Sequence, residues 1–184
     1  PRSTPKPSSA ASDVYKRQLF LQDRLSKARR RSEKIRTLVK VDGDAKRLFT
    51  TGAYPQGTYG AVAQGYDPTT ISTLVRMAHR CCSGDAAGQC ATTNIILGLG
   101  MNHHPSLKCP VAQVQSWFEV ISSPNVDMVE TAKAFFVIKQ ELLAHQRTMW
   151  NRVKGSIGAI IATLVRYRWN PVSPFKWLGV GIPW

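Results

Sequence analysis

Cysteine and histidine side chains gather in one stretch of the sequence. Thiolate and imidazole are ligands that zinc prefers, and seven such residues lie within 31 positions: His79, Cys81, Cys82, Cys90, His103, His104 and Cys109. His104 and Cys109 have the His-x4-Cys spacing of half a zinc knuckle, but no Cys-x2-Cys pair precedes them. Cys81 and Cys82 are adjacent and would need unusual backbone geometry to share a metal. The pattern favours buried thiols and surface histidines over a metal site.

A catalytic cysteine would have to come from the same stretch. Such a nucleophile needs an imidazole base that a third group orients, and nothing in the pattern supplies the third group. The sequence has no Gly-x-Ser-x-Gly, P-loop or dinucleotide-binding pattern, and "GLGMNHH" lacks the strand-to-helix context of a phosphate-binding loop. We therefore expect no catalytic residue, no metal and no cofactor in these residues.

Positive charge is the second chemical feature. The chain holds 25 Lys and Arg against 11 Asp and Glu, a formal charge of +14 at pH 7, which favours a polyanionic partner. Residues 1–47 contain 14 of the basic residues and 5 of the acidic ones. The candidate nucleic-acid-binding residues lie there, in an expected helix: Arg24, Lys27, Arg29, Arg30, Arg31, Lys34 and Arg36.

This basic helix has three interpretations. It lies along a phosphate backbone, where each neutralised phosphate releases counterions, or it is a solvated helix face that happens to be positive. Docking on anionic lipid is less favoured because the opposite face has no Trp. No apolar run reaches the roughly 18 residues of a membrane-spanning helix. We expect nucleic acid, and no membrane, as the partner.

The pattern of the chain predicts a mainly α-helical fold. Residues 1–18 are rich in Pro and Ser and are expected to be disordered, and "AASDVYKRQ" at 10–18 resembles translated library adapter sequence and not part of a fold. Residues 19–168 are expected to form an irregular bundle of about six helices, and residues 169–184 a Trp- and Pro-rich tail. The expected helices cover residues 19–40, 67–83, 90–100 (a buried strand being the alternative), 110–121, 125–146 and 150–167.

Local signals fix several boundaries of these elements. Asp67 can cap the helix that Pro68 begins, and Asp44 can cap a turn after Gly43. Residues 50–60 are expected to form a loop because of their Gly, Pro and Thr content. No Asn-Gly pair signals a hairpin. The helices at 19–40, 125–146 and 150–167 have apolar stripes, which are Leu21, Leu25, Ala28, Ile35 and Leu38; Val129, Ala132, Phe136 and Leu143; and Val153, Ile157, Ile160, Ile161 and Leu164.

Three tryptophans mark the C-terminal tail. Trp169, Trp177 and Trp184 are eight and seven residues apart, and large aromatics normally lie in a packed or contacting surface. Trp169 and Trp177 either cap the core of this domain or contact a partner. A core anchor at the last residue is hard to hold in place, so Trp184 leads us to expect that the natural chain continues.

Several stretches together are similar to one known family. They are "TTGAYPQGTYG", "GQCATTNIILGLG" followed by "HHPSL", "QVQSWFEVI" and "GSIGAIIATLVRYRWNPVSPFKW". In this order they resemble the region downstream of the polymerase palm in the reverse-transcriptase-like proteins of non-LTR retroelements that abound in dinoflagellate transcriptomes. The similarity runs over residues 34–184 and is carried by pattern, including the Gly-x-x-Pro-Thr helix start at Gly65.

The resemblance implies a region without catalytic residues. Reverse transcriptases hold two metal ions on paired aspartates in the palm, and this sequence has no Asp-Asp pair. Leu178 stands where relatives often have an acidic residue, while Gly179, Gly181 and Trp184 keep the outline of the closing unit. The resemblance also implies that the tail leads into a further domain and that the basic helix lies near the thumb, which grips template and primer.

Two functions follow for the chain as a whole. The first is a non-catalytic fragment of a retroelement reverse-transcriptase-like polyprotein that makes salt-dependent, sequence-nonspecific nucleic-acid contacts, with the other domains of the polyprotein as further partners. The alternative is a stand-alone helical protein-interaction module that docks a partner through its Trp-rich tail. Four cysteines are too few for a disulfide scaffold, and no signal peptide precedes them, so we expect an intracellular protein.

Overall fold

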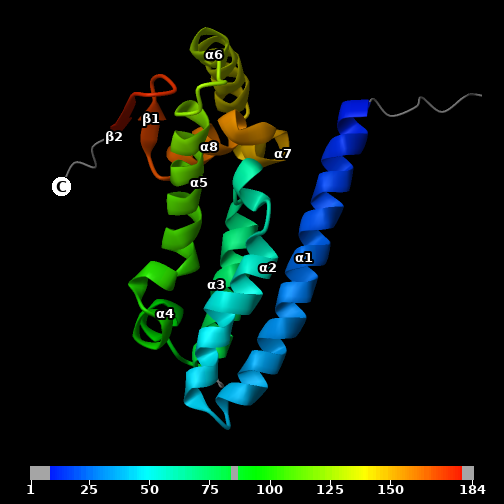
Figure 1. The fold of residues 1–184 in the computed structure, drawn as a ribbon, viewed down its shortest axis with the longest axis vertical. Helices are drawn as coiled ribbons and strands as arrows, with labels where there is room; N and C mark the ends of the chain where they lie inside the picture. The colour runs from blue at the N-terminus through cyan, green and yellow to red at the C-terminus, as the bar shows by residue number, and fades with distance from the viewer. Residues whose placement is uncertain (1–8, 84–86, 180–184) are drawn as a thin grey trace, which may run out of the picture.

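The structure is mainly α-helical, as the sequence predicted. The computed structural model describes residues 9–83 and 87–179, in which eight α-helices precede a two-stranded sheet (Figure 1). These elements are α1 (Ser9–Val39), α2 (Tyr54–Thr58), α3 (Pro68–Ser83), α4 (Ala91–Leu99), α5 (Pro105–Ile121), α6 (Met128–Ala144), α7 (Met149–Arg152), α8 (Gly155–Arg166), β1 (Trp169–Pro171) and β2 (Trp177–Gly179). The short turns are η1 (Gly43–Lys46), η2 (Phe49–Ala53), η3 (Ala61–Ala63), η4 (Met101–His103) and η5 (Gln146–Thr148).

The first helix begins earlier than the sequence predicted. The sequence predicted this helix from Leu19, whereas α1 begins at Ser9; residues 1–8 lie outside the described part of the chain. No residue of α1 is Gly or Pro, so nothing in it breaks the helix. Leu38, expected in the inner stripe, is exposed. The stripe that packs α1 against α2 and α3 consists of Leu21, Leu25, Ala28, Ile35 and Val39.

The expected loop at residues 50–60 is helical instead. A π-helical turn, η2, leads directly into α2, and Pro55 lies in the first turn of α2, where its missing N–H costs no helical hydrogen bond. A Cβ on Gly57 would lie 3.2 Å from Ala28 Cβ on α1 and 3.3 Å from Leu74 Cδ2 on α3. The absence of a side chain at Gly57 therefore lets α2 approach both helices, which is a packing role and not a turn role.

Aspartate side chains cap the starts of two helices. Asp67 Oδ1 accepts two backbone N–H groups in the first turn of α3, at 2.8 and 3.0 Å, and Pro68 is the first residue of that helix, as predicted. Asp127 caps α6 in the same way. The predicted cap at Asp44 is wrong, because Asp44 lies inside the η1 turn. Asp42, which precedes the turn, accepts its N–H at 2.9 Å.

Helix α5 joins two hydrophobic clusters. Cys109, near its N-terminus, is buried with residues of α1, α2, α3 and α4. Trp117 and Ile121, near its C-terminus, are buried with residues of α6, α7 and α8. The predicted helix at 110–121 is therefore confirmed at its end, but it begins five residues earlier than expected, at Pro105.

Pro110 lies inside α5 and would ordinarily break it. Because proline has no N–H, the carbonyl of Ser106, four residues earlier, has no helical donor. The Tyr167 hydroxyl donates to that carbonyl at 2.9 Å. Partial burial raises the pKa of the Tyr167 phenol, which keeps the donated proton in place. The helix continues because a distant side chain replaces the missing donor.

The buried face of α6 differs from the predicted stripe. Phe135 and Leu142 are 0% and 1% exposed in the second cluster, whereas Val129 and Phe136 are 64% and 48% exposed. Phe136 and Leu143 each have an apolar neighbour one position earlier, so the sequence pattern allows two stripes. Packing of α6 on α8 selects the stripe that the sequence analysis did not choose.

The predicted last helix is divided in two. Residues 150–167 form α7 and α8, which separate at Val153 and Lys154, and Gly155 begins α8 with a positive φ of 65°. The predicted apolar stripe is confirmed, since its residues all lie in or against the second cluster: Val153, Ile157, Ile160, Ile161 and Leu164.

A hairpin that the sequence did not predict follows α8. Strand β1 pairs antiparallel with β2, with Trp169 opposite Gly179. The connection has no Asn-Gly turn. Instead, Ser173 Oγ accepts the backbone N–H groups of Phe175 and Lys176 at 3.3 and 3.0 Å, a local side-chain turn that the sequence signal for hairpins does not cover.

The α6 packing predicts unequal effects at two adjacent phenylalanines. Phe135→Ala should lower the free energy of unfolding by about 3 to 5 kcal/mol, because it leaves a cavity in the second cluster. Phe136→Ala is the matched control and should change it by about 0.5 kcal/mol or less. Urea unfolding followed by circular dichroism measures both. If Phe136→Ala were the more damaging change, α6 would bury the stripe that the sequence predicted.

Candidate nucleic-acid interface

The basic residues predicted from the sequence lie on the outer side of α1. The inner stripe of α1 is occupied by α2 and α3, so the cations fall on the remaining arc of the helix. Helical spacing divides them into a set beside α2, a set beside α3 and a ridge between the two. None is buried: Lys27, Arg29, Arg30, Arg31 and Lys34 are exposed, and Arg24 and Arg36 are half-buried.

The first set lines the α1–α2 groove, an open depression between α1 and the η2–α2 segment. Arg31 Nη1 donates to the Gly52 carbonyl at 3.2 Å. Arg24 donates to the Tyr59 carbonyl, and its guanidinium carbon lies 4.8 Å from the centre of the Tyr59 ring. These contacts hold the two arginine side chains in place and leave other N–H donors of each guanidinium for a ligand. The groove is lined by Arg24, Lys27, Arg31, Thr51, Gly52, Pro55, Gln56 and Tyr59.

The second set lines a groove between α1 and α3. Two residues that the sequence analysis did not select, Arg76 and Arg80 on α3, lie there with Arg29. Glu33 pairs with Arg80 at 3.3 Å and with Arg36 at 3.9 Å. Arg76 and Arg80 are four residues apart on the polar side of a correctly predicted helix. The sequence did not indicate that this side of α3 lies next to the basic helix.

The ridge between the grooves carries Arg30 and Lys34, one helical turn apart and both exposed. The two acidic residues on this part of α1 are Asp23 and Glu33, and Asp23 pairs with Lys27 at 2.7 Å. Such exposed ion pairs contribute little stability, about 0 to 1 kcal/mol. Their cations can therefore exchange a carboxylate for a phosphate at little cost.

Among the described residues, no helix has both the length and the apolar character that a membrane span requires. Helix α1 is long enough, but its charged arc excludes it from the hydrocarbon core of a bilayer.

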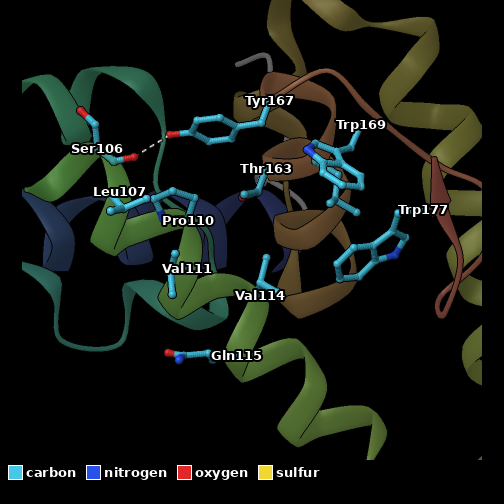
Figure 2. A pocket seen from close by; sticks show the side chains of 11 residues that line it. Ser106, Leu107, Pro110, Val111, Val114, Gln115, Thr163, Tyr167, Trp169 and Trp177 are labelled. Atoms are coloured by element: carbon cyan, nitrogen blue, oxygen red, sulfur yellow. Dashed lines mark hydrogen bonds between the residues drawn. The ribbon is translucent and has the colours of Figure 1, made fainter. Parts of the chain in front are cut away.

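A second candidate site, the Trp pocket, lies between α5, the C-terminal part of α8 and the hairpin (Figure 2). Its volume is about 390 Å³, within the usual range of ligand pockets. Leu107, Pro110, Val111 and Val114 of α5 form one wall, and Trp169 and Trp177 form the opposite one. The lining is almost wholly apolar, so the pocket can hold an apolar side chain or a small apolar molecule.

The two described tryptophans of the tail have different environments. Trp177 packs against the second cluster, with its ring centre 5.6 Å from that of Phe118. Trp169 is 46% exposed at the edge of the pocket. Trp117 Nε1 donates to the Pro174 carbonyl at 3.0 Å and fastens the hairpin to α5. Trp184, on which the expectation of a longer chain depends, lies outside the described residues.

The cysteine and histidine residues do not assemble into a site. His79 Nε2 lies 3.1 Å from Asn94 Nδ2, and His104 Nδ1 accepts the Ser106 N–H at the start of α5. Cys81 and Cys109 are buried in the first cluster. Within residues 9–83 and 87–179, no group of three or more His, Cys, Asp or Glu side chains is placed to hold a metal.

The four thiols differ in their protonation. Burial raises the pKa of Cys81 to about 12 and those of Cys82 and Cys109 to about 11. Cys90 is exposed at the N-cap of α4, and the Thr93 side chain and the backbone N–H groups of Thr93 and Thr92, near its sulfur, lower its pKa. Since the thiolate is the reactive form, Cys90 is the reactive thiol of the four.

Alkylation tests this ranking. At about pH 8, iodoacetamide should modify Cys90 first, and Cys90→Ser should abolish the fast phase measured by mass spectrometry. Cys82→Ser is the control and should leave that phase unchanged. A fast phase that survives Cys90→Ser would mean that one of the buried thiols is accessible.

Comparison with known proteins gives no match. No protein-family model, no curated protein and no solved structure matches this chain. The similarity to reverse-transcriptase-like proteins therefore stays a prediction from the sequence, and the function has to be inferred from the surfaces of this chain.

Proposed function

We propose that this protein binds the phosphate backbone of nucleic acid through α1 and its two flanking grooves. The observation that carries the proposal is the placement of all seven predicted cations outside the core, with Arg76 and Arg80 added beside them by α3. A net charge of +14 attracts a polyanion over longer range. This function suits a non-catalytic part of a retroelement polyprotein that acts inside the cell.

The chemistry of these contacts sets their specificity. Arg and Lys side chains neutralise phosphates and release counterions, which gives affinity that depends strongly on salt. Phosphate contacts fix the position of a nucleic acid but do not read its sequence. We therefore expect binding with little preference among sequences of the same strandedness.

The ridge provides the direct test. Arg30→Ala with Lys34→Ala should weaken binding and lower the slope of log K against log salt by about 0.7 to 0.9 for each phosphate that these two side chains neutralise. Fluorescence anisotropy with a labelled oligonucleotide over a series of salt concentrations measures the slope. Lys133→Ala with Lys139→Ala on α6 removes the same charge elsewhere and should keep the wild-type slope. Equal slopes in all three proteins would contradict the proposal.

The second candidate function is binding of a partner protein at the Trp pocket. The pocket favours it because an apolar cavity of this size accepts an anchor side chain, and two cations of this region are exposed, Arg168 just before β1 and Lys176 between the two strands. Arg168 has a positive φ of 60°, a strained conformation of the kind found at functional sites. The partner is then an acidic peptide segment with one large apolar residue.

Selection from a peptide library tests the pocket. Peptides with an apolar anchor between Asp or Glu residues should be enriched on the wild-type protein but not on Val111→Asp, which places a charge in the pocket wall. Phe136→Asp puts the same charge on the exposed face of α6 and should retain them. Enrichment of the same peptides on Val111→Asp would exclude the pocket as their site. Deletion of the tail is a poorer test, because Pro171 and Pro174 are fully buried.

A further inference from the structure

Tyr59 is an aromatic residue that lines the α1–α2 groove together with Arg24, Lys27 and Arg31. It follows the last residue of α2 and is 71% exposed, more than any other aromatic side chain of residues 19–83 and 87–179. A large aromatic ring is costly to leave in water. Nothing in the folding of α2 requires a ring at this position, because the packing contacts of α2 come from its buried residues Tyr54, Gly57 and Thr58.

Arg24 fixes the position of the Tyr59 ring. Its guanidinium lies over the ring, 4.8 Å from the centre, and one of its N–H groups donates to the Tyr59 carbonyl. The two contacts attach the ring to α1 from one side. Because the ring is mostly exposed, its other face is open to a planar partner.

The ring stands beside three cations that lie in a row. Arg24, Lys27 and Arg31 are three and four residues apart along α1, so the row extends over about 10 Å of the helix axis. All three line the α1–α2 groove with Tyr59. A short stretch of phosphate backbone can therefore contact Lys27 and Arg31 while a neighbouring base reaches the ring.

Only an unpaired base can use this arrangement. In a duplex the faces of the bases are covered by their neighbours, whereas in a single strand they are free to stack on an aromatic side chain. Cations contact phosphates, so cations alone cannot discriminate a single strand from a duplex through base stacking. The ring beside the cations therefore selects strandedness.

We propose that the α1–α2 groove binds single-stranded nucleic acid, with one base stacked on the open face of Tyr59 and the adjacent phosphates on Lys27 and Arg31. This inference rests on the proposed nucleic-acid binding and adds the form of the nucleic acid. Both RNA and DNA single strands have the chemistry that the groove needs.

The test uses the full chain and Tyr59→Ala, with Tyr59→Phe as the variant that keeps a ring. A labelled single-stranded oligonucleotide, as RNA and as DNA, is compared with the same sequence annealed to its complement. Tyr59→Ala should weaken single-strand binding about five- to a hundredfold, leave duplex binding unchanged and keep the salt slope, since stacking releases no counterions. Tyr59→Phe should retain single-strand binding, and Phe136→Ala on α6 should have no effect.

A base analogue gives an independent readout. The fluorescence of 2-aminopurine in the single strand should be quenched by the wild-type protein and by Tyr59→Phe but not by Tyr59→Ala. Equal weakening of single-strand and duplex binding in Tyr59→Ala, or no weakening of either, would overturn the stacking proposal while leaving backbone binding intact. Absence of any binding by the wild-type protein would instead overturn the proposed function itself.

Discussion

The close approach of α1, α2 and α3 at Gly57 is the contact on which the basic surface depends. Because Gly57 has no side chain, Ala28 of α1 and Leu74 of α3 can occupy the space beside α2 that a Cβ at this position would need. This contact commits the small and apolar side of α1 to the core and turns its charged arc outward. It also sets the end of α2 beside α1, so that Tyr59 meets Arg24. A larger residue at this point would separate the helices and widen the groove.

Helix α5 separates the two candidate sites, the basic outer side of α1 and the Trp pocket. The first hydrophobic cluster supports the basic face on α1, and the second supports the Trp pocket, while α5 contributes to both clusters. In Figure 1, α1 and the hairpin lie on opposite sides of the molecule, with α3, α5 and α8 between them. The hydrogen bond that the Tyr167 hydroxyl donates to the Ser106 carbonyl keeps α5 continuous past Pro110. Because α5 is continuous at this point, it connects the two hydrophobic clusters directly.

Local signals were sufficient for some elements and insufficient for others. The cap at Asp67 and the stripe of α8 need only neighbouring residues, and both were predicted correctly. The choice between Phe135 and Phe136 was wrong because α8, far along the chain, decides which stripe is buried. The prediction of a loop around Gly57 was wrong for a similar reason, because the role of this glycine is set by its contacts with α1 and α3. The position of the seven cations on the outer side of α1 follows from their spacing in the helix, but Arg76, Arg80 and Tyr59 lie beside them only through the packing of α3 and α2 on α1.

The arrangement of charge on α1 is unfavourable for the helix itself. Lys27 and Arg31, and likewise Arg30 and Lys34, are like charges four residues apart, which destabilise an isolated helix by about 0.2 to 0.5 kcal/mol for each pair. Asp23 and Glu33 offset only part of this repulsion, through exposed ion pairs. None of these four cations lies in either hydrophobic cluster, although Arg31 donates a hydrogen bond to the Gly52 carbonyl across the α1–α2 groove. A local choice that costs stability without a packing gain is expected at a functional surface, and a bound polyanion would remove the repulsion that the fold tolerates.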